Sequence, residues 1–125
     1  MREIKFRAWN TGIKEMFYFD LFTVSNEIHL RKQNMIMQYT GLKDKNGKEI
    51  YEDDIIEQVT NVIVMGKTTK REKITRRIVT FKNGLFAVRN KKGNIMWCLN
   101  FKDELYVPEP YVVGNIYENP ELIGK

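Results

Sequence analysis

The feature that most constrains the fold is a period-two alternation of apolar and polar residues in short runs. Ile4, Phe6 and Ala8 alternate with Lys5 and Arg7 at the start of the chain. This pattern is typical of a strand with one buried face, because successive side chains point to opposite sides of a sheet. Comparable runs occur at 15–19, 35–40, 55–59, 62–65, 74–81, 85–89, 95–99 and 111–117. They predict a mainly β protein without a long helix.

Turn residues separate the runs and predict how neighbouring strands connect. Asn-Gly pairs at 46–47 and 83–84 favour tight turns, because Gly and Asn tolerate a positive φ. We expect a hairpin over 4–19 and a three-stranded meander over 74–99. The polar, basic segment 66–73 is predicted to be the tip of a hairpin, and 21–31 fits either a strand pair or a helical turn. Asn119 and Pro120 predict a short helical turn near the end.

Many short strands joined by Gly and Asn turns favour a small β-barrel with an N-terminal β-rich extension. The 125 residues suit one compact unit. The lone cysteine, Cys98, excludes an internal disulfide framework and a multi-cysteine metal site. No run approaches the roughly 20 apolar residues of a membrane span. We therefore expect a cytoplasmic protein with no cofactor.

Acidic residues cluster in the centre of the chain, at Glu49, Glu52, Asp53, Asp54 and Glu57. Carboxylate oxygens are the ligands that Ca²⁺ and Mg²⁺ prefer, so a divalent-cation site is one interpretation. In an extended segment, however, adjacent side chains diverge, which favours solvated charges at turns and strand edges.

Few residues offer a catalytic arrangement. Ser25 and His29 would share a face of a helix, but nothing nearby marks an oxyanion hole or a nucleophile elbow. Cys98 has the apolar neighbours of a buried structural thiol. We therefore predict a protein that is not an enzyme.

Positive charge is concentrated in one segment. Between Lys67 and Lys92 there are ten Lys and Arg residues and one acid, Glu72, although the whole chain carries only +5. The candidate contacts to a nucleic acid or a partner are Lys67, Lys70, Arg71, Lys73, Arg76 and Arg77. A basic patch attracts phosphate backbones, but Lys and Arg also protect exposed strand edges from association, so both interpretations stay open.

Three stretches of the sequence resemble the YopX family of phage and prophage proteins. They are Met1–Trp9 (MREIKFRAW), Gln38–Glu52 (QYTGLKDKNGKEIYE) and Val113–Leu122 (VGNIYENPEL). The resemblance implies an SH3-like small β-barrel over 41–125, with an N-terminal β-rich subdomain over 1–40 packed against it as one unit. It also implies a phage or prophage origin, but no activity.

One position departs from the family pattern. The family reads Glu-Gly-Asp where this chain has Glu52-Asp53-Asp54, so a positive φ is expected at Asp53. We interpret the family motifs mainly as fold chemistry. Gly41, Gly47 and Gly114 would supply backbone freedom, and Asn115 and Asn119 would bond to the local backbone.

These observations favour a non-catalytic binding or regulatory module that acts on a host or phage protein in a bacterial cell. The alternative is nucleic-acid binding through the basic hairpin 67–77. A membrane partner is not expected. Self-association through the apolar run Met35-Ile36-Met37 also stays open.

Overall fold

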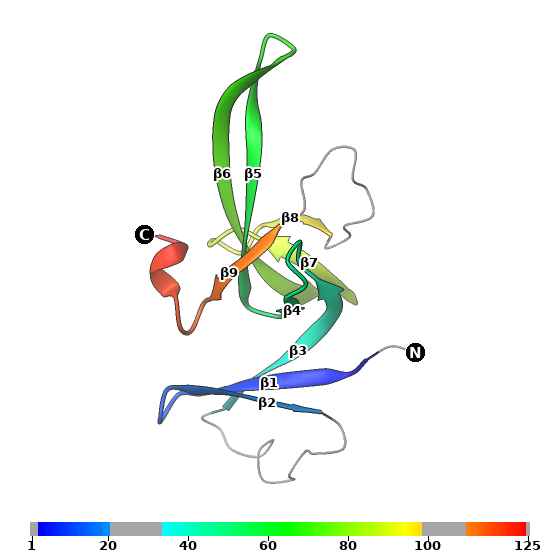
Figure 1. Cartoon of the computed structure of the whole chain (residues 1–125). Coiled ribbons are helices and arrows are strands. Elements are labelled where there is room, and N and C mark those ends of the chain that lie inside the picture. Colours follow the sequence, from blue (N-terminus) through cyan, green and yellow to red (C-terminus); the bar gives the residue numbers. More distant parts are fainter. Residues whose placement is uncertain (1–2, 21–33, 99–109, 125) are drawn as a thin grey trace.

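The computed structural model describes residues 3–20, 34–98 and 110–124, and strands make up 67% of them. The strands form two antiparallel sheets, one with four strands and one with five (Figure 1). The predicted mainly β class is therefore confirmed.

The four-stranded sheet contains the N-terminal hairpin. Its strands are β1 (Lys5–Asn10), β2 (Glu15–Asp20), β3 (Asn34–Lys43) and β4 (Glu49–Tyr51), in the order β2-β1-β3-β4. Ala8, at the centre of β1, is fully buried and lies opposite Phe17 of β2 and Ile36 of β3. The predicted hairpin over 4–19 is confirmed, and the apolar alternation in β1 sets its register.

The five-stranded sheet contains the predicted meander. Its strands are β5 (Asp54–Val64), β6 (Lys67–Lys82), β7 (Leu85–Arg89), β8 (Ile95–Cys98) and β9 (Tyr111–Asn115), in the order β8-β7-β6-β5-β9. The last strand returns to pair with β5. A 3₁₀ turn, η1 (Pro120–Leu122), then begins at the predicted proline, although the Asn119 side chain makes no capping bond.

The predicted closed barrel is wrong for the part of the chain that the structure describes. There, β2 and β4 remain edges of one sheet, and β8 and β9 remain edges of the other. Apolar side chains from both sheets build the core instead of filling one closed sheet. Ile50 of the first sheet packs with Ile56, Val79 and Val88 of the second, and each is at most 1% exposed. β3 runs across the subdomain boundary predicted at 40/41.

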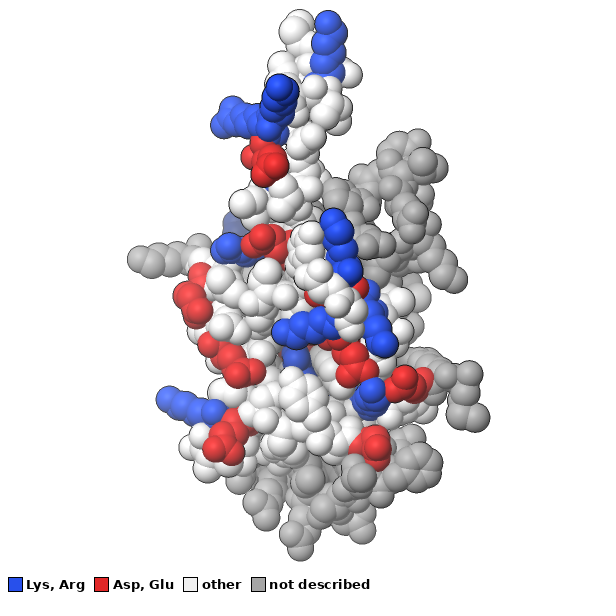
Figure 2. Space-filling view, viewed as in Figure 1, with Lys and Arg blue, Asp and Glu red and all other residues white. Residues whose placement is uncertain are grey.

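β5 and β6 continue beyond the rest of their sheet as a two-stranded ribbon. Pairing extends from Gln58 with Thr75 to Val64 with Lys67. We call residues 58–75 the arm and the remaining described residues the body. The arm projects away from the body in the ribbon view and stands clear of it in the space-filling view (Figures 1 and 2).

The hairpin predicted around 66–73 is confirmed, but its tip is shorter than predicted, because Lys67 already begins β6. The turn consists of Met65 (φ 53°) and Gly66 (φ 78°). These φ values are nearly the same as those of the Asn83-Gly84 turn, at 54° and 78°. Met carries none of the turn preference of Asn, so Gly66 was the one turn signal at this position.

Candidate functional site

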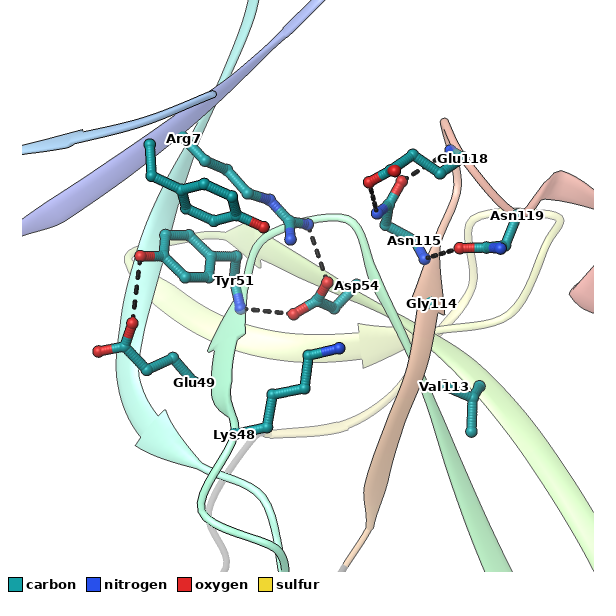
Figure 3. A pocket seen from close by; sticks show the side chains of 11 residues that line it. Arg7, Lys48, Glu49, Tyr51, Asp54, Val113, Gly114, Asn115, Glu118 and Asn119 are labelled. Atoms are coloured by element: carbon teal, nitrogen blue, oxygen red, sulfur yellow. Dashed lines mark hydrogen bonds and ion pairs between the residues drawn. The ribbon is translucent and has the colours of Figure 1, made fainter. Parts of the chain in front are cut away.

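A buried ion pair connects the two sheets. Nη2 of Arg7, on β1, lies 2.9 Å from Oδ1 of Asp54, on β5, and the two side chains are 4% and 2% exposed. Nη2 also donates to the Glu52 carbonyl oxygen at 2.9 Å, and Nε donates to the Met37 sulfur at 3.4 Å. The guanidinium carbon lies 4.9 Å from the centre of the Tyr51 ring. Arg7 therefore fixes the N-terminal sheet against the start of β5 (Figure 3).

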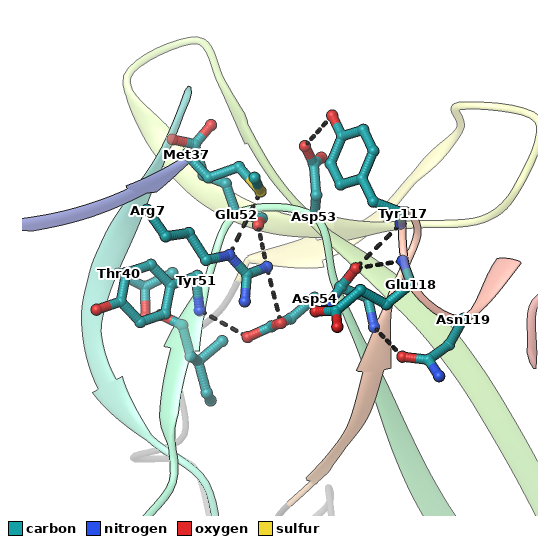
Figure 4. A network of polar contacts seen from close by, with 12 residues as sticks. Arg7, Met37, Thr40, Tyr51, Glu52, Asp53, Asp54, Tyr117, Glu118 and Asn119 are labelled. Atoms are coloured by element: carbon teal, nitrogen blue, oxygen red, sulfur yellow. Dashed lines mark hydrogen bonds and ion pairs between the residues drawn. The ribbon is translucent and has the colours of Figure 1, made fainter. Parts of the chain in front are cut away.

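Asp53 adopts the backbone conformation that the family pattern predicted, with φ 66°. Its amide donates to Val79, its carbonyl accepts from Ile116, and its carboxylate accepts from the Tyr117 hydroxyl at 3.0 Å (Figure 4). Burial raises the pKa of this carboxyl, although the Tyr117 hydroxyl opposes the shift. The acid thus keeps the turn that Gly would make and adds a side-chain contact that Gly cannot make.

A pocket of about 380 Å³ lies beside the ion pair (Figure 3). Its charged lining includes Arg7, Lys48, Glu49, Asp54 and Glu118, which have both signs. Glu49 is paired with Lys5, and Glu118 accepts from the Asn115 side chain. The charged lining therefore consists of three acids and two cations, and each of the three acids already contacts a neighbouring side chain.

The other acids of the central cluster also separate. Glu57 pairs with Arg76, and Glu52 accepts from the Gln38 backbone amide. Among the described residues, no three His, Cys, Asp or Glu side chains form a group that could hold a metal ion. Ser25 and His29 lie outside the described residues.

Asp44 joins the β3–β4 turn to the distant strand β9. One carboxylate oxygen accepts from the backbone amides of Asn46 and Lys48, both at 2.8 Å. The other accepts from the amide of Val112 at 2.9 Å. Burial alone would raise the pKa of Asp44, but the three N–H donors outweigh it and lower the pKa. This role of Asp44 was not predicted from the sequence, although Asp is a common turn former and Asn46-Gly47 follows two residues later.

We expect Asp44→Asn to lower the free energy of unfolding by about 2 kcal/mol at neutral pH, because an amide presents only one acceptor oxygen to three donors. A lowered folded-state pKa stabilises above the ordinary value of 3.8, and this contribution disappears as pH falls through the folded-state pKa. The difference in the free energy of unfolding between wild type and variant should therefore decrease at acidic pH. Urea unfolding across pH measures it, with the exposed Glu15→Gln as control. A difference in unfolding free energy that does not change with pH would contradict the role of the Asp44 carboxylate as the acceptor of these bonds.

The six predicted basic contacts lie in two different parts of the structure. Lys67, Lys70, Arg71 and Lys73 are exposed on the arm. Arg76 instead pairs with Glu57 at 2.9 Å and donates to the Leu122 carbonyl at 3.2 Å. Arg77 is half-buried and donates to the carbonyl of Arg76. The last two cations therefore belong to the body, and four remain available on the arm.

The end of the arm is apolar, which was not predicted because the tip of the hairpin was expected at 66–73. Ile63, Val64 and Met65 are 66%, 53% and 96% exposed. We call these three residues the tip. Contiguous exposed apolar side chains on a protrusion are a feature of interaction sites.

The side chains of the apolar run Met35-Ile36-Met37, which suggested self-association, do not all lie on the surface. Met35 and Ile36 are 44% and 41% exposed, whereas Met37 is 1% exposed and contacts Arg7. Only the first two side chains are therefore on the surface.

Comparison with known proteins shows what the chain is similar to. The model of the YopX protein family matches residues 23–124. The crystal structure of protein EF1440 from Enterococcus faecalis is 27% identical, with a TM-score of 0.59, and the match covers 96% of this chain and 97% of that one. Protein yopX from Bacillus subtilis is 21% identical and has the same overall fold, with a TM-score of 0.57 and coverage of 94% and 96%.

The comparison with curated proteins found no match. Within the described residues, no helix has the length and apolar character needed to cross a membrane. Because the family model matches most of the chain, the protein belongs to the YopX family.

Proposed function

We propose that this protein is a non-catalytic binding or regulatory module of a phage or prophage, which acts on a protein partner in the bacterial cell through the tip of the arm. The observation that carries the proposal is the exposure of Ile63, Val64 and Met65 at the end of a projecting ribbon. Burial of one such side chain in a partner contributes about 1.5–3 kcal/mol. Three together form an anchor of the kind found at the centre of protein interfaces.

Backbone strain at the tip supports the same conclusion. Met65 has φ 53°, a region that residues other than Gly, Asn and Asp rarely adopt. Met is also nearly fully exposed there, so no packing within the described chain explains its choice. The turn requires this conformation but not a Met side chain, and residues that adopt such a conformation at a cost are concentrated at functional sites. The flexible thioether is suited to filling an irregular pocket on a partner.

The body serves as the scaffold in this proposal. The ion pair between Arg7 and Asp54 fixes its two sheets, and the pocket beside that pair has lining charges of both signs. We also propose an SH3-like character for the five-stranded sheet. In support of it, the meander β5-β6-β7-β8 is completed by β9, which returns beside β5.

The substitution Met65→Asn tests the proposal. Asn tolerates the left-handed conformation, so the free energy of unfolding should rise by about 1 kcal/mol. Loss of the apolar anchor should abolish capture of the partner from a nuclease-treated bacterial lysate. Urea unfolding and affinity capture with mass spectrometry measure the two effects.

The matched control is Asn83→Met, which places Met in the equivalent turn of the body. It should lower stability by about 1 kcal/mol and leave capture unchanged. A protein captured by wild type and Asn83→Met, but not by Met65→Asn, supports the proposal. Equal capture by all three proteins would contradict it.

A further inference from the structure

We propose that the arm also binds double-stranded DNA, and that the cations of β6 contact phosphates while the ribbon lies in the major groove. These cations are different side chains from the three of the apolar tip, so the inference does not depend on the protein partner. The cations are Lys67, Lys70, Arg71 and Lys73.

The charge of the arm comes almost entirely from one strand. On β5, residues 58–64 include no charged side chain, and Glu72 is the only acid of the arm. Lys67 pairs with Val64, and Lys73 pairs with Thr60. Since residues opposite each other share a face, and since residues two apart on β5 point the same way, Lys67 and Lys73 project from one face of the ribbon. Glu72 projects from the other face.

A bulge presents the two remaining cations. Pairing shifts between Asn61 and Ile63, so residues 69–71 lie opposite Val62 alone. The Thr69 hydroxyl donates to the Val62 carbonyl oxygen at 2.5 Å and accepts from the Arg71 amide at 3.3 Å. These bonds fix the backbone that carries Lys70 and Arg71. Figure 2 shows Lys and Arg side chains on the outer part of the arm.

The dimensions of the arm suit a DNA duplex. The major groove of B-form DNA admits a two-stranded β-ribbon. Lys67 and Lys73 lie opposite Val64 and Thr60, which are four residues apart on β5, or about 13 Å at roughly 3.3 Å per residue, and this length can reach several phosphates. Thr60, Thr68 and Asn61 add hydroxyl and amide groups that can bond to phosphate oxygens.

Other nucleic acids fit the arm less well. The major groove of A-form RNA is too deep and narrow to admit side chains from a ribbon. Proteins that bind single strands stack the bases on aromatic side chains, and residues 58–75 include no Phe, Tyr or Trp. The arm therefore favours duplex DNA over duplex RNA and over single strands.

Fluorescence anisotropy with a labelled DNA duplex of about 20 base pairs, titrated over about 50–200 mM salt, tests the inference. Four phosphate contacts predict a slope of log K against log salt of about −3.6, since each contact contributes about −0.9. The variant Lys67→Gln/Lys73→Gln should reduce the slope to about −1.8 and weaken binding at least tenfold at the lowest salt. The matched control, Lys82→Gln/Lys92→Gln, removes two exposed charges of the body and should bind like wild type.

Absence of duplex binding at low salt would overturn the inference. So would an equal loss of affinity in the arm and body variants, because the effect would then follow net charge and not the arm. Equal affinity for duplex RNA or single-stranded DNA would contradict binding of the ribbon in the major groove of DNA. Met65→Asn separates the two proposals, because it should keep DNA binding while it loses the protein partner.

Discussion

Gly114→Ala is expected to lower the free energy of unfolding by about 3 kcal/mol, because the site has no space for a methyl group. A Cβ there would lie 2.7 Å from Cγ and 2.9 Å from Cβ of Asn119, closer than real Cβ contacts come. The Asn119 side chain cannot move without cost, since its oxygen accepts from the Asn115 amide at 3.2 Å. The contact joins β9 to the turn that follows it.

Urea unfolding followed by circular dichroism measures this effect, and a double variant provides the control. Gly114→Ala/Asn119→Ala removes the side chain that the new methyl group would meet. It should therefore be less destabilised than the sum of the two single variants. Strict additivity, or a Gly114→Ala protein as stable as wild type, would contradict the steric role of Gly114.

Arg7→Met is expected to destabilise the protein by about 3–5 kcal/mol, because it leaves the buried carboxylate of Asp54 without its cation. An unpaired buried acid has a raised pKa, so the folded state is favoured at a pH low enough to protonate it. The loss of stability in Arg7→Met should therefore be greatest at neutral pH and should diminish toward about pH 4.

Two variants control for the ion pair. Arg7→Met/Asp54→Asn removes the buried charge as well and should recover part of the lost stability. Lys5→Met removes the partly exposed contacts of Lys5 with Glu3 and Glu49, and should destabilise the protein much less than Arg7→Met, because water screens exposed ion pairs. An Arg7→Met protein whose loss does not change with pH would contradict the role of Asp54.

Local features of the fold could be predicted from the sequence. Alternating apolar residues predicted the hairpin of β1 with β2, and the Asn83-Gly84 pair predicted the turn between β6 and β7. The positive φ at Asp53 followed from the Gly that the family has there. Each of these depends on residues close together in the chain, where propensity decides the backbone.

Features that depend on distant residues could not be predicted in the same way. Arg7 and Asp54 meet only because β1 packs on the start of β5, and no local pattern marks that contact. Gly114 was interpreted as a source of backbone freedom, but its φ is not positive, and it provides space for Asn119. A single sequence does not distinguish these two roles of Gly.

The basic segment was identified from the sequence, but the part assigned to a hairpin tip belongs to strand β6. Arg76 was counted as a contact because its pairing with Glu57 depends on the β5–β6 register. The apolar tip was missed because Met65 occupies a turn position where Asn or Gly is usual.

The central claim is that binding resides in the arm and that the body is its scaffold. The most direct test is a variant in which Asn-Gly replaces residues 60–73, so that Val59 and Ile74, which already pair, flank a two-residue turn. We expect cooperative thermal unfolding within about 5 °C of wild type, with neither partner capture nor duplex binding. A folded, shortened protein that still captures the same partner, or still binds the duplex, would contradict the claim.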